Sequence, residues 1–178
     1  MANTRKRKPQ PEKKETLSLA EESGVAYAAA VPESVAIAGK IWALLGGKLF
    51  AKQLPGTSLE FYSAVKRGVP KISIDQMAEI MSVPMTKMAE LLNLSYKTLT
   101  RKSKHDLLDV SVSSHAFEMA EVIARGLEVF ETEGRFSRWL HKENFALHGA
   151  RPLDLLDSPA GIRLVTELLG RIEEGVYS

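Results

Sequence analysis

The sequence predicts an all-α protein in which a helix-turn-helix bundle is followed by a smaller helical region. Three observations predict this class. Apolar residues recur through most of the chain at the spacing of a helix with one buried face. Glycine, asparagine and proline fall where these stretches begin or end. The 44% hydrophobic content of the 178 residues is also enough to build a core.

The stretch 85–101 carries the most information because it has the spacing of a helix-turn-helix. Asn93 tolerates the left-handed backbone of a sharp turn, Ser95 is placed to cap the second helix, and Leu99 would anchor that helix. The residues left to face outward suit DNA: Tyr96, Lys97, Thr98, Arg101 and Lys102. The same pattern also fits an ordinary helical hairpin whose basic residues are only solvated.

The chain is expected to begin with a disordered basic arm and a linker, over residues 1–31. Residues 1–15 hold six basic residues and two prolines and have almost nothing to bury. This arm fits two interpretations, a contact with phosphates or a solvated tail.

Two helices are expected between the linker and the bundle. The first, over residues 32–45, buries Ile41, Trp42 and Leu45 and stops at Gly46. The second, over residues 59–66, is expected to pack four side chains inward: Leu59, Phe61, Tyr62 and Val65.

The bundle itself is predicted as three helices, over residues 74–81, 85–92 and 95–104. Ser73 is expected to cap the first of them, and Pro84 is pre-set for the first turn of the second. The third is the helix that would carry the DNA contacts. This order of helices predicts a compact DNA-binding unit.

The second half of the chain is also predicted to be helical. A long helix over residues 114–131 has Gly126 at a point of close packing, and a shorter helix holds Phe136, Trp139 and Leu140. Residues 144–152 are expected to form a loop, followed by a short helix over 153–156. The last helix, over residues 159–174, starts after a strong capping signal and is closed by Gly175.

Charge divides the chain into two regions. Residues 66–105 carry eight basic and three acidic residues, a net charge of +5, whereas residues 106–178 carry seven basic and thirteen acidic residues, a net charge of −6. The total of only +2 hides this asymmetry. A basic region next to an acidic one predicts two surfaces with different partners.

Composition and spacing also exclude several classes of function. The chain has no cysteine, which rules out disulfides and a thiol nucleophile, and its four histidines lack metal-ligand spacing. Asp154 and Asp157 are explained by capping of a helix start. We therefore expect no enzyme activity, no cofactor and no metal site. Without a membrane span or signal peptide, a cytoplasmic protein is expected.

Three passages resemble the Xre/MbcA/ParS group of antitoxins, partners of toxins with an RES domain. One is the helix-turn-helix passage 94–102; a second is 120–140, which ends in Phe-Ser-Arg-Trp-Leu. The third and most specific joins Arg-Pro-Leu-Asp-Leu-Leu at 151–156 to Gly161 and to the ending Leu-Gly-Arg-Ile-Glu-Glu-Gly-Val-Tyr-Ser at 169–178. The resemblance extends over residues 35–178.

The resemblance implies a mechanism. Such antitoxins bind a co-encoded RES toxin that consumes NAD or uses it to ADP-ribosylate a target, block its active site with their C-terminal segment, and repress their own operon. The residues that would bind the toxin are Arg171, Glu174, Gly175, Val176, Tyr177 and Ser178. The residues that would bind the operator are Ser95, Tyr96, Lys97, Thr98, Arg101 and Lys102. A homodimer, and a larger hetero-oligomer with the toxin, are implied as well.

This interpretation divides the chain into the arm and linker (1–31), a DNA-binding and dimerisation region (32–110) and a toxin-binding domain (111–178). Gly175 would let the chain leave the last helix at an unusual angle, and Glu173, Glu174 and the terminal carboxylate would offer negative charge to a basic cleft. Alternatively, Val176 and Tyr177 fold back over the last helix. The alternative function is a dimeric transcription regulator whose acidic half senses a ligand or dimerises.

Overall fold

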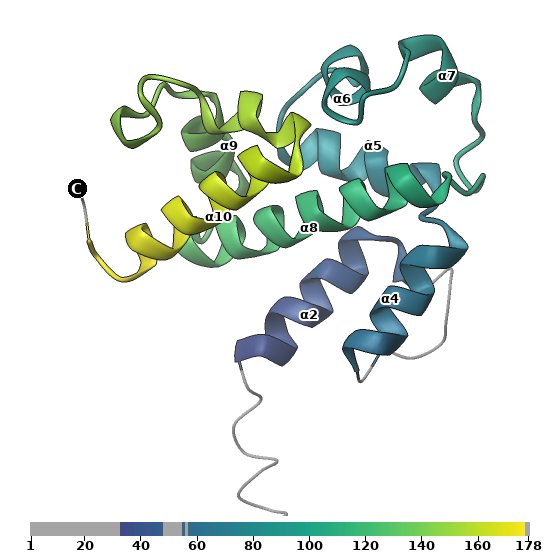
Figure 1. Ribbon diagram of the computed structural model, residues 1–178, viewed down its shortest axis with the longest axis horizontal. Coiled ribbons are helices and arrows are strands. Elements are labelled where there is room, and N and C mark those ends of the chain that lie inside the picture. The colour runs from purple at the N-terminus through teal and green to yellow at the C-terminus, as the bar shows by residue number, and fades with distance from the viewer. Residues whose placement is uncertain (1–32, 48–54, 56, 177–178) are drawn as a thin grey trace, which may run out of the picture. The chain divides into compact units, whose positions relative to one another are not determined.

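The structure is a computed structural model that describes residues 33–47, 55 and 57–176. Within these residues the secondary structure is helical, apart from an isolated antiparallel bridge between Pro70 and Leu107 (Figure 1). The predicted all-α class is confirmed. The chain divides into two units after Ala36, and the second unit, Ile37–Ser178, contains every contact described below. The predicted basic arm lies outside the described residues.

Helix α2 (Glu33–Leu44) ends where the glycine pair predicted it to end. Gly46 adopts a φ of 69°, a left-handed conformation that glycine reaches without a steric penalty. Ile41, Trp42 and Leu45 are buried, as expected from their spacing. The Trp42 and Phe61 rings form a T-shaped pair at a centroid distance of 5.6 Å. These contacts attach the second half of α2 to the rest of the Ile37–Ser178 unit.

Helix α4 (Ser58–Arg67) forms where it was predicted, but part of its buried face was predicted wrongly. Leu59 is 72% exposed and Tyr62 is 58% exposed. Ala64 and Val65 are buried, and Phe61 lies 6.1 Å from Phe117 of the long helix that follows. The inward stripe of α4 is therefore narrower than its apolar residues suggest, because α4 buries only the side that meets this helix.

Helix α5 (Lys71–Ile80) begins earlier than predicted, and Ser73 is not its cap. The N-cap residue is Pro70, and the first free backbone N–H groups, of Lys71 and Ile72, donate to the carbonyls of Asp106 and Lys104 at 3.0 and 2.9 Å. A side-chain cap is not needed when a distant loop supplies these acceptors. Ser73 is instead fully buried inside the helix.

The predicted helix-turn-helix is formed by α6 (Met85–Leu91) and α7 (Tyr96–Arg101), with α5 as the helix before it. Helix α7 ends at Arg101, three residues before the predicted end. Helix α8 (Val110–Phe130) follows and starts four residues before the predicted start, because the Asp109 carboxylate accepts a hydrogen bond from the Val112 N–H at 3.0 Å. This capping aspartate was overlooked in the sequence.

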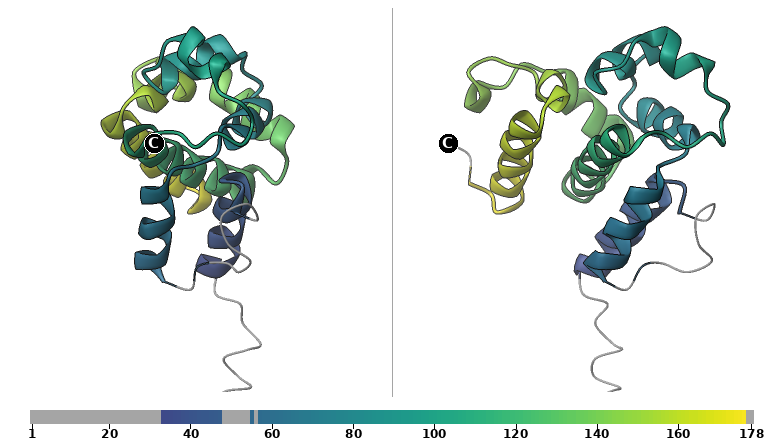
Figure 2. Two further views of the ribbon diagram at one scale, coloured as in Figure 1. Left: turned by 90° about the vertical axis from the view of Figure 1, so that its right-hand side faces the viewer. Right: turned by 45° about the vertical axis from the view of Figure 1, so that its right-hand side comes forward.

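Four elements follow α8: α9 (Glu133–His141), the 3₁₀ turns η1 (Phe145–Leu147) and η2 (Pro152–Asp157), and α10 (Pro159–Glu173). Helices α9 and α10 pack against α8, and η2 packs against α6, α9 and α10 (Figure 1). Helix α10 lies next to α8 in both Figure 1 and Figure 2. The predicted loop over 144–152 is therefore largely correct, with one short 3₁₀ turn inside it.

Helix α8 joins the two halves of the molecule. It packs against α4 and α5 from the first half and against α9 and α10 from the second half. The buried apolar residues from α2 to α10 accordingly form one continuous core. The predicted domain boundary between residues 110 and 111 falls at the first turn of this helix and stays a prediction.

Candidate functional site

The turn between α6 and α7 has the geometry expected of a helix-turn-helix. Asn93 adopts a φ of 55°, the left-handed conformation predicted for it. The Ser95 hydroxyl accepts a hydrogen bond from the Thr98 N–H at 3.0 Å, which caps α7. Leu99 is fully buried. The turn, the cap and the buried leucine fix the orientation of α7, which has only six residues.

The candidate DNA contacts differ in how freely they face the solvent. Tyr96, Lys97, Thr98 and Arg101 are exposed on α7, and Ser95 is exposed at its start. Lys102 is only half-exposed, and its ammonium group donates to the carbonyl of Leu107 at 3.0 Å. A phosphate would have to replace this contact. Lys97 and Arg101 are therefore the cations of this set that the fold leaves most available.

The helix-turn-helix is fastened to the second half of the chain by η2. The Asn93 side-chain amide donates to the carbonyl of Asp157 at 2.9 Å. Lys87 of α6 pairs with Asp154 at 3.1 Å, and Arg151 pairs with the other carboxylate oxygen of Asp154 at 2.7 Å. Asp154 thus bridges two cations instead of capping a helix, which corrects the sequence interpretation.

The contacts with Arg151 and Lys87 lower the pKa of the Asp154 carboxyl group. Partial burial raises its pKa, but the hydrogen bonds from Arg151 and Lys87 and the positive charges of both groups outweigh the burial. The net pKa lies below the usual value for aspartate. The ionised form is therefore favoured in the folded protein, and the contact between η2 and α6 depends on it.

Helix α10 ends in a Schellman motif. Gly175 adopts a φ of 71°, its N–H donates to the carbonyl of Ile172 at 3.1 Å, and the N–H of Val176 donates to the carbonyl of Arg171 at 2.9 Å. Glycine at this position was predicted to close the helix, and the prediction is confirmed. The motif redirects the chain away from the helix axis.

The structure leaves the candidate toxin contacts before residue 177 exposed. Arg171, Glu174 and Gly175 are exposed, and the Val176 side chain is 51% exposed. Such exposure speaks against the alternative in which Val176 folds back over the last helix. Tyr177 and Ser178 lie outside the described residues.

One acidic residue near this end is already paired. Glu173 forms an ion pair with Arg125 of α8 at 2.8 Å. The Arg125 guanidinium lies over Gly170. A Cβ added at Gly170 would lie 3.2 Å from the nearest guanidinium nitrogen. Glu173 therefore holds α10 against α8, and Glu174 is left as the exposed carboxylate. The Arg125–Glu173 pair could not be predicted from sequence, because its partners lie 48 positions apart.

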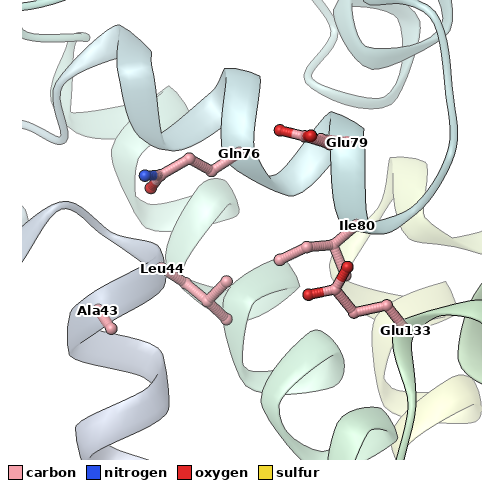
Figure 3. A pocket seen from close by; sticks show the side chains of 6 residues that line it. All are labelled: Ala43, Leu44, Gln76, Glu79, Ile80 and Glu133. Carbon is pink, nitrogen blue, oxygen red and sulfur yellow. The ribbon is translucent and has the colours of Figure 1, made fainter.

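A shallow hollow of about 370 Å³ lies elsewhere, between α2, α5 and α9. Gln76 and Glu79 project from α5 and Glu133 from the start of α9, with Leu44 of α2 facing them (Figure 3). This hollow includes none of the residues predicted to bind DNA or a toxin. Within the part of the chain that the structure describes, no group of three histidine or acidic side chains is arranged to hold a metal ion.

No helix in the part of the chain that the structure describes combines the length and the apolar character that a membrane span requires.

Two family models match the chain side by side. Residues 60–121 match the antitoxin Xre-like helix-turn-helix domain, and residues 125–175 match the antitoxin Xre/MbcA/ParS C-terminal toxin-binding domain. The first match contains α5, α6 and α7, and the second contains α9, η1, η2 and α10. Both matches include part of α8.

Two curated relatives agree with these models. The chain is 25% identical over 124 residues to the Prs ADP-ribosylating antitoxin of Sphingobium sp. (strain YBL2), an alignment of 64% of this chain and 78% of that protein. It is 26% identical over 123 residues to antitoxin Xre of Yersinia enterocolitica serotype O:8 / biotype 1B, with 65% and 79% aligned.

A solved structure also matches. The crystal structure of the M. tuberculosis MbcT-MbcA toxin-antitoxin complex contains a chain with 18% sequence identity and a TM-score of 0.45, and the match includes 61% of this chain and 96% of that chain.

The protein is an antitoxin, in which a helix-turn-helix precedes a toxin-binding domain. It belongs to the Xre/MbcA/ParS antitoxins, since the two family models together match more than half of its residues and both curated relatives carry antitoxin names. The resemblance drawn from the three sequence passages is thereby confirmed. A toxin-binding domain in the acidic half also favours the antitoxin over a regulator with a sensor or dimerisation domain.

Proposed function

We propose that this antitoxin neutralises a co-encoded RES-domain toxin that consumes NAD or uses it to ADP-ribosylate a target. The toxin-binding match over residues 125–175 supports a toxin partner. ADP-ribosylation, the activity in the name of the Sphingobium relative, is a reaction that uses NAD. The antitoxin would act by binding alone, with no catalytic step and no cofactor of its own.

The proposed inhibitory element is the C-terminal tip, defined as Arg171 and residues 174–178. The observation that carries this proposal is the Schellman motif, which turns the chain at Gly175 and leaves Val176 exposed. A cleft that holds the pyrophosphate of NAD needs basic groups, and the exposed Glu174 offers them a carboxylate. The tip would then occupy the site that NAD otherwise enters.

Deletion of residues 176–178 tests this mechanism. We expect the full-length antitoxin to stop NAD consumption by the purified toxin, and the shortened chain to lose this inhibition. Its melting temperature should fall only slightly, because the deletion removes the backbone hydrogen bond of Val176 to Arg171 but no residue of the buried core. Operator binding should stay unchanged, because α7 lies elsewhere in the chain. The measurement is NAD fluorescence or absorbance over a titration of antitoxin.

The matched control is Arg163→Ala, which removes an exposed cation from the same helix, far from the tip. Its inhibition should match that of the unchanged protein. Full inhibition by the shortened chain would refute an active-site role for the tip.

The second part of the proposal is autorepression. A homodimer would place two α7 helices in successive major grooves of the operator, with Lys97 and Arg101 contacting phosphates or base edges. The exposure of both side chains and the Xre-like helix-turn-helix match support this role. Assembly with the toxin would produce a larger hetero-oligomer on the same DNA, in the cytoplasm.

A further inference from the structure

Phe145 is exposed to an unusual degree. Its side chain is 94% accessible, more than any other large hydrophobic residue in the described part of the chain. An aromatic side chain gains its stabilising effect by burial, and one that stays in water contributes nothing to folding. Packing within its own chain therefore does not explain why a phenylalanine stands at position 145.

The loop that displays Phe145 is closed by its own hydrogen bonds. The backbone N–H of Asn144 donates to Ala150 at 3.1 Å, and the N–H of Gly149 donates back to Asn144 at 2.9 Å. The Asn144 side chain accepts from the Ala146 N–H at 2.9 Å. The phenylalanine is thus held on a preformed 3₁₀ turn, so little conformational entropy remains to be lost when it binds.

Two residues in the left-handed region close the same loop. His148 adopts a φ of 55°, a conformation in which histidine, like asparagine and aspartate, is enriched, and Gly149 follows with a φ of 87°. They turn the chain back toward Asn144, so that the loop closes on itself.

The position of the loop identifies the partner. Phe145 lies inside the match to the toxin-binding domain, between α9 and η2. Figure 1 shows this loop and the C-terminal end of α10 on the same side of the helices, and the right-hand view of Figure 2 agrees. A protein that contacts the tip would therefore approach the side of the molecule on which this loop lies.

We propose that Phe145 is an anchor that enters an apolar pocket on the toxin beside the NAD site. This inference rests on the proposed function and adds a second contact to it. The tip blocks the active site, while Phe145 supplies affinity. A rigid aromatic side chain entering a pocket is a typical binding hot spot.

Phe145→Ala tests the anchor by titration with the purified toxin. We expect the affinity to fall by about tenfold to a hundredfold, the range of an aromatic hot spot. The melting temperature should not change, because the side chain is already in water. At saturating concentration the variant should still inhibit the toxin fully, whereas the chain shortened by residues 176–178 should not.

Leu59→Ala is the matched control. Leu59 is another strongly exposed apolar residue, at 72%, and it lies on α4, outside the toxin-binding match. We expect its affinity for the toxin to equal that of the unchanged protein.

The outcomes separate this inference from the proposed function. If the unchanged antitoxin fails to bind the toxin, the proposed function fails and the anchor fails with it. If the unchanged protein binds and Phe145→Ala binds equally well, the anchor alone is overturned. A lower mass of the variant in light scattering without toxin would identify a second copy of the chain as the occupant and would also overturn the anchor.

Discussion

At the scale of the residue, Gly126 shows how closely α8 and α9 are packed. An added Cβ would lie 2.1 Å from a ring carbon of Phe136, which is fully buried. The Phe136 ring also contacts Phe130 and Trp139 and cannot move aside freely. The close packing at Gly126 was predicted from sequence, although its partner was not.

Gly126→Ala should therefore lower the free energy of unfolding by about 1–3 kcal/mol, the range for overpacking a core. Gly39→Ala is the control, since no atom lies within 4 Å of its added Cβ and alanine is the better helix former in α2. Urea denaturation of both variants measures the effect. Equal stability of Gly126→Ala and the unchanged protein would contradict the packing argument.

Asp154 makes the stability depend on pH. Because its pKa is lower in the folded state, its ionised form stabilises the fold at pH values above the ordinary aspartate pKa. This contribution is lost as the pH falls through the lowered folded-state pKa. Asp154→Asn should cost on the order of 1 kcal/mol near neutral pH, since the group is one-third exposed and its ion pairs are screened.

The cost of the same substitution should shrink as the pH falls below the ordinary aspartate pKa, and it should become small once the pH is below the lowered folded-state pKa, where the carboxylate of the unchanged protein is protonated. Urea denaturation at several pH values gives the difference between the two proteins. A difference that stays constant down to acidic pH would show that Asp154 acts through packing and not through charge.

At the scale of the element, α7 illustrates what a local pattern can predict. Its start was predicted because Ser95 can cap it, and its anchor was predicted because Leu99 follows Ala89 by ten residues, the spacing of a helix-turn-helix. Its end was predicted three residues too late. The Ser103 N–H donates to the Asp106 carboxylate at 2.8 Å, and this turn ends the helix although the sequence remains basic.

Arg101→Ala tests the role of α7 in the proposed repression. If Arg101 reads a base, operator affinity should fall by about 1–3 kcal/mol in a gel-shift series at fixed salt. Lys142→Ala is the control, because it removes an exposed basic residue from the opposite half of the chain. If Arg101→Ala leaves the operator affinity unchanged, Arg101 is not part of the DNA interface.

Helices α5 and α8 show two different reasons for a missed boundary. The first N–H groups of α5 are satisfied by carbonyls more than thirty positions later, which no local pattern reveals. The start of α8 does carry a local signal, because the Asp109 carboxylate accepts a hydrogen bond from the Val112 N–H. The start of α5 therefore depended on tertiary contacts, whereas the start of α8 could have been predicted from its capping aspartate.

At the scale of the whole molecule, the order of the helices and the two functional halves could be predicted from periodicity, charge and resemblance. The hydrogen bonds and ion pairs that join the two halves could not be predicted. Asn93 and Asp157, for example, lie 64 positions apart in the sequence. Hydrogen bonds and ion pairs between such distant residues depend on the finished fold. The anchor at Phe145 was missed for the opposite reason, because the loop was expected to be featureless.

Helix α8 has a consequence for protein engineering. The two family matches meet within this one helix, between residues 121 and 125, so a chimaera that exchanges toxin specificity needs its junction there. Each residue inserted or removed would rotate the following turn by about 100° around the helix axis. A graft would retain the core only if donor and recipient were spliced in the same helical register.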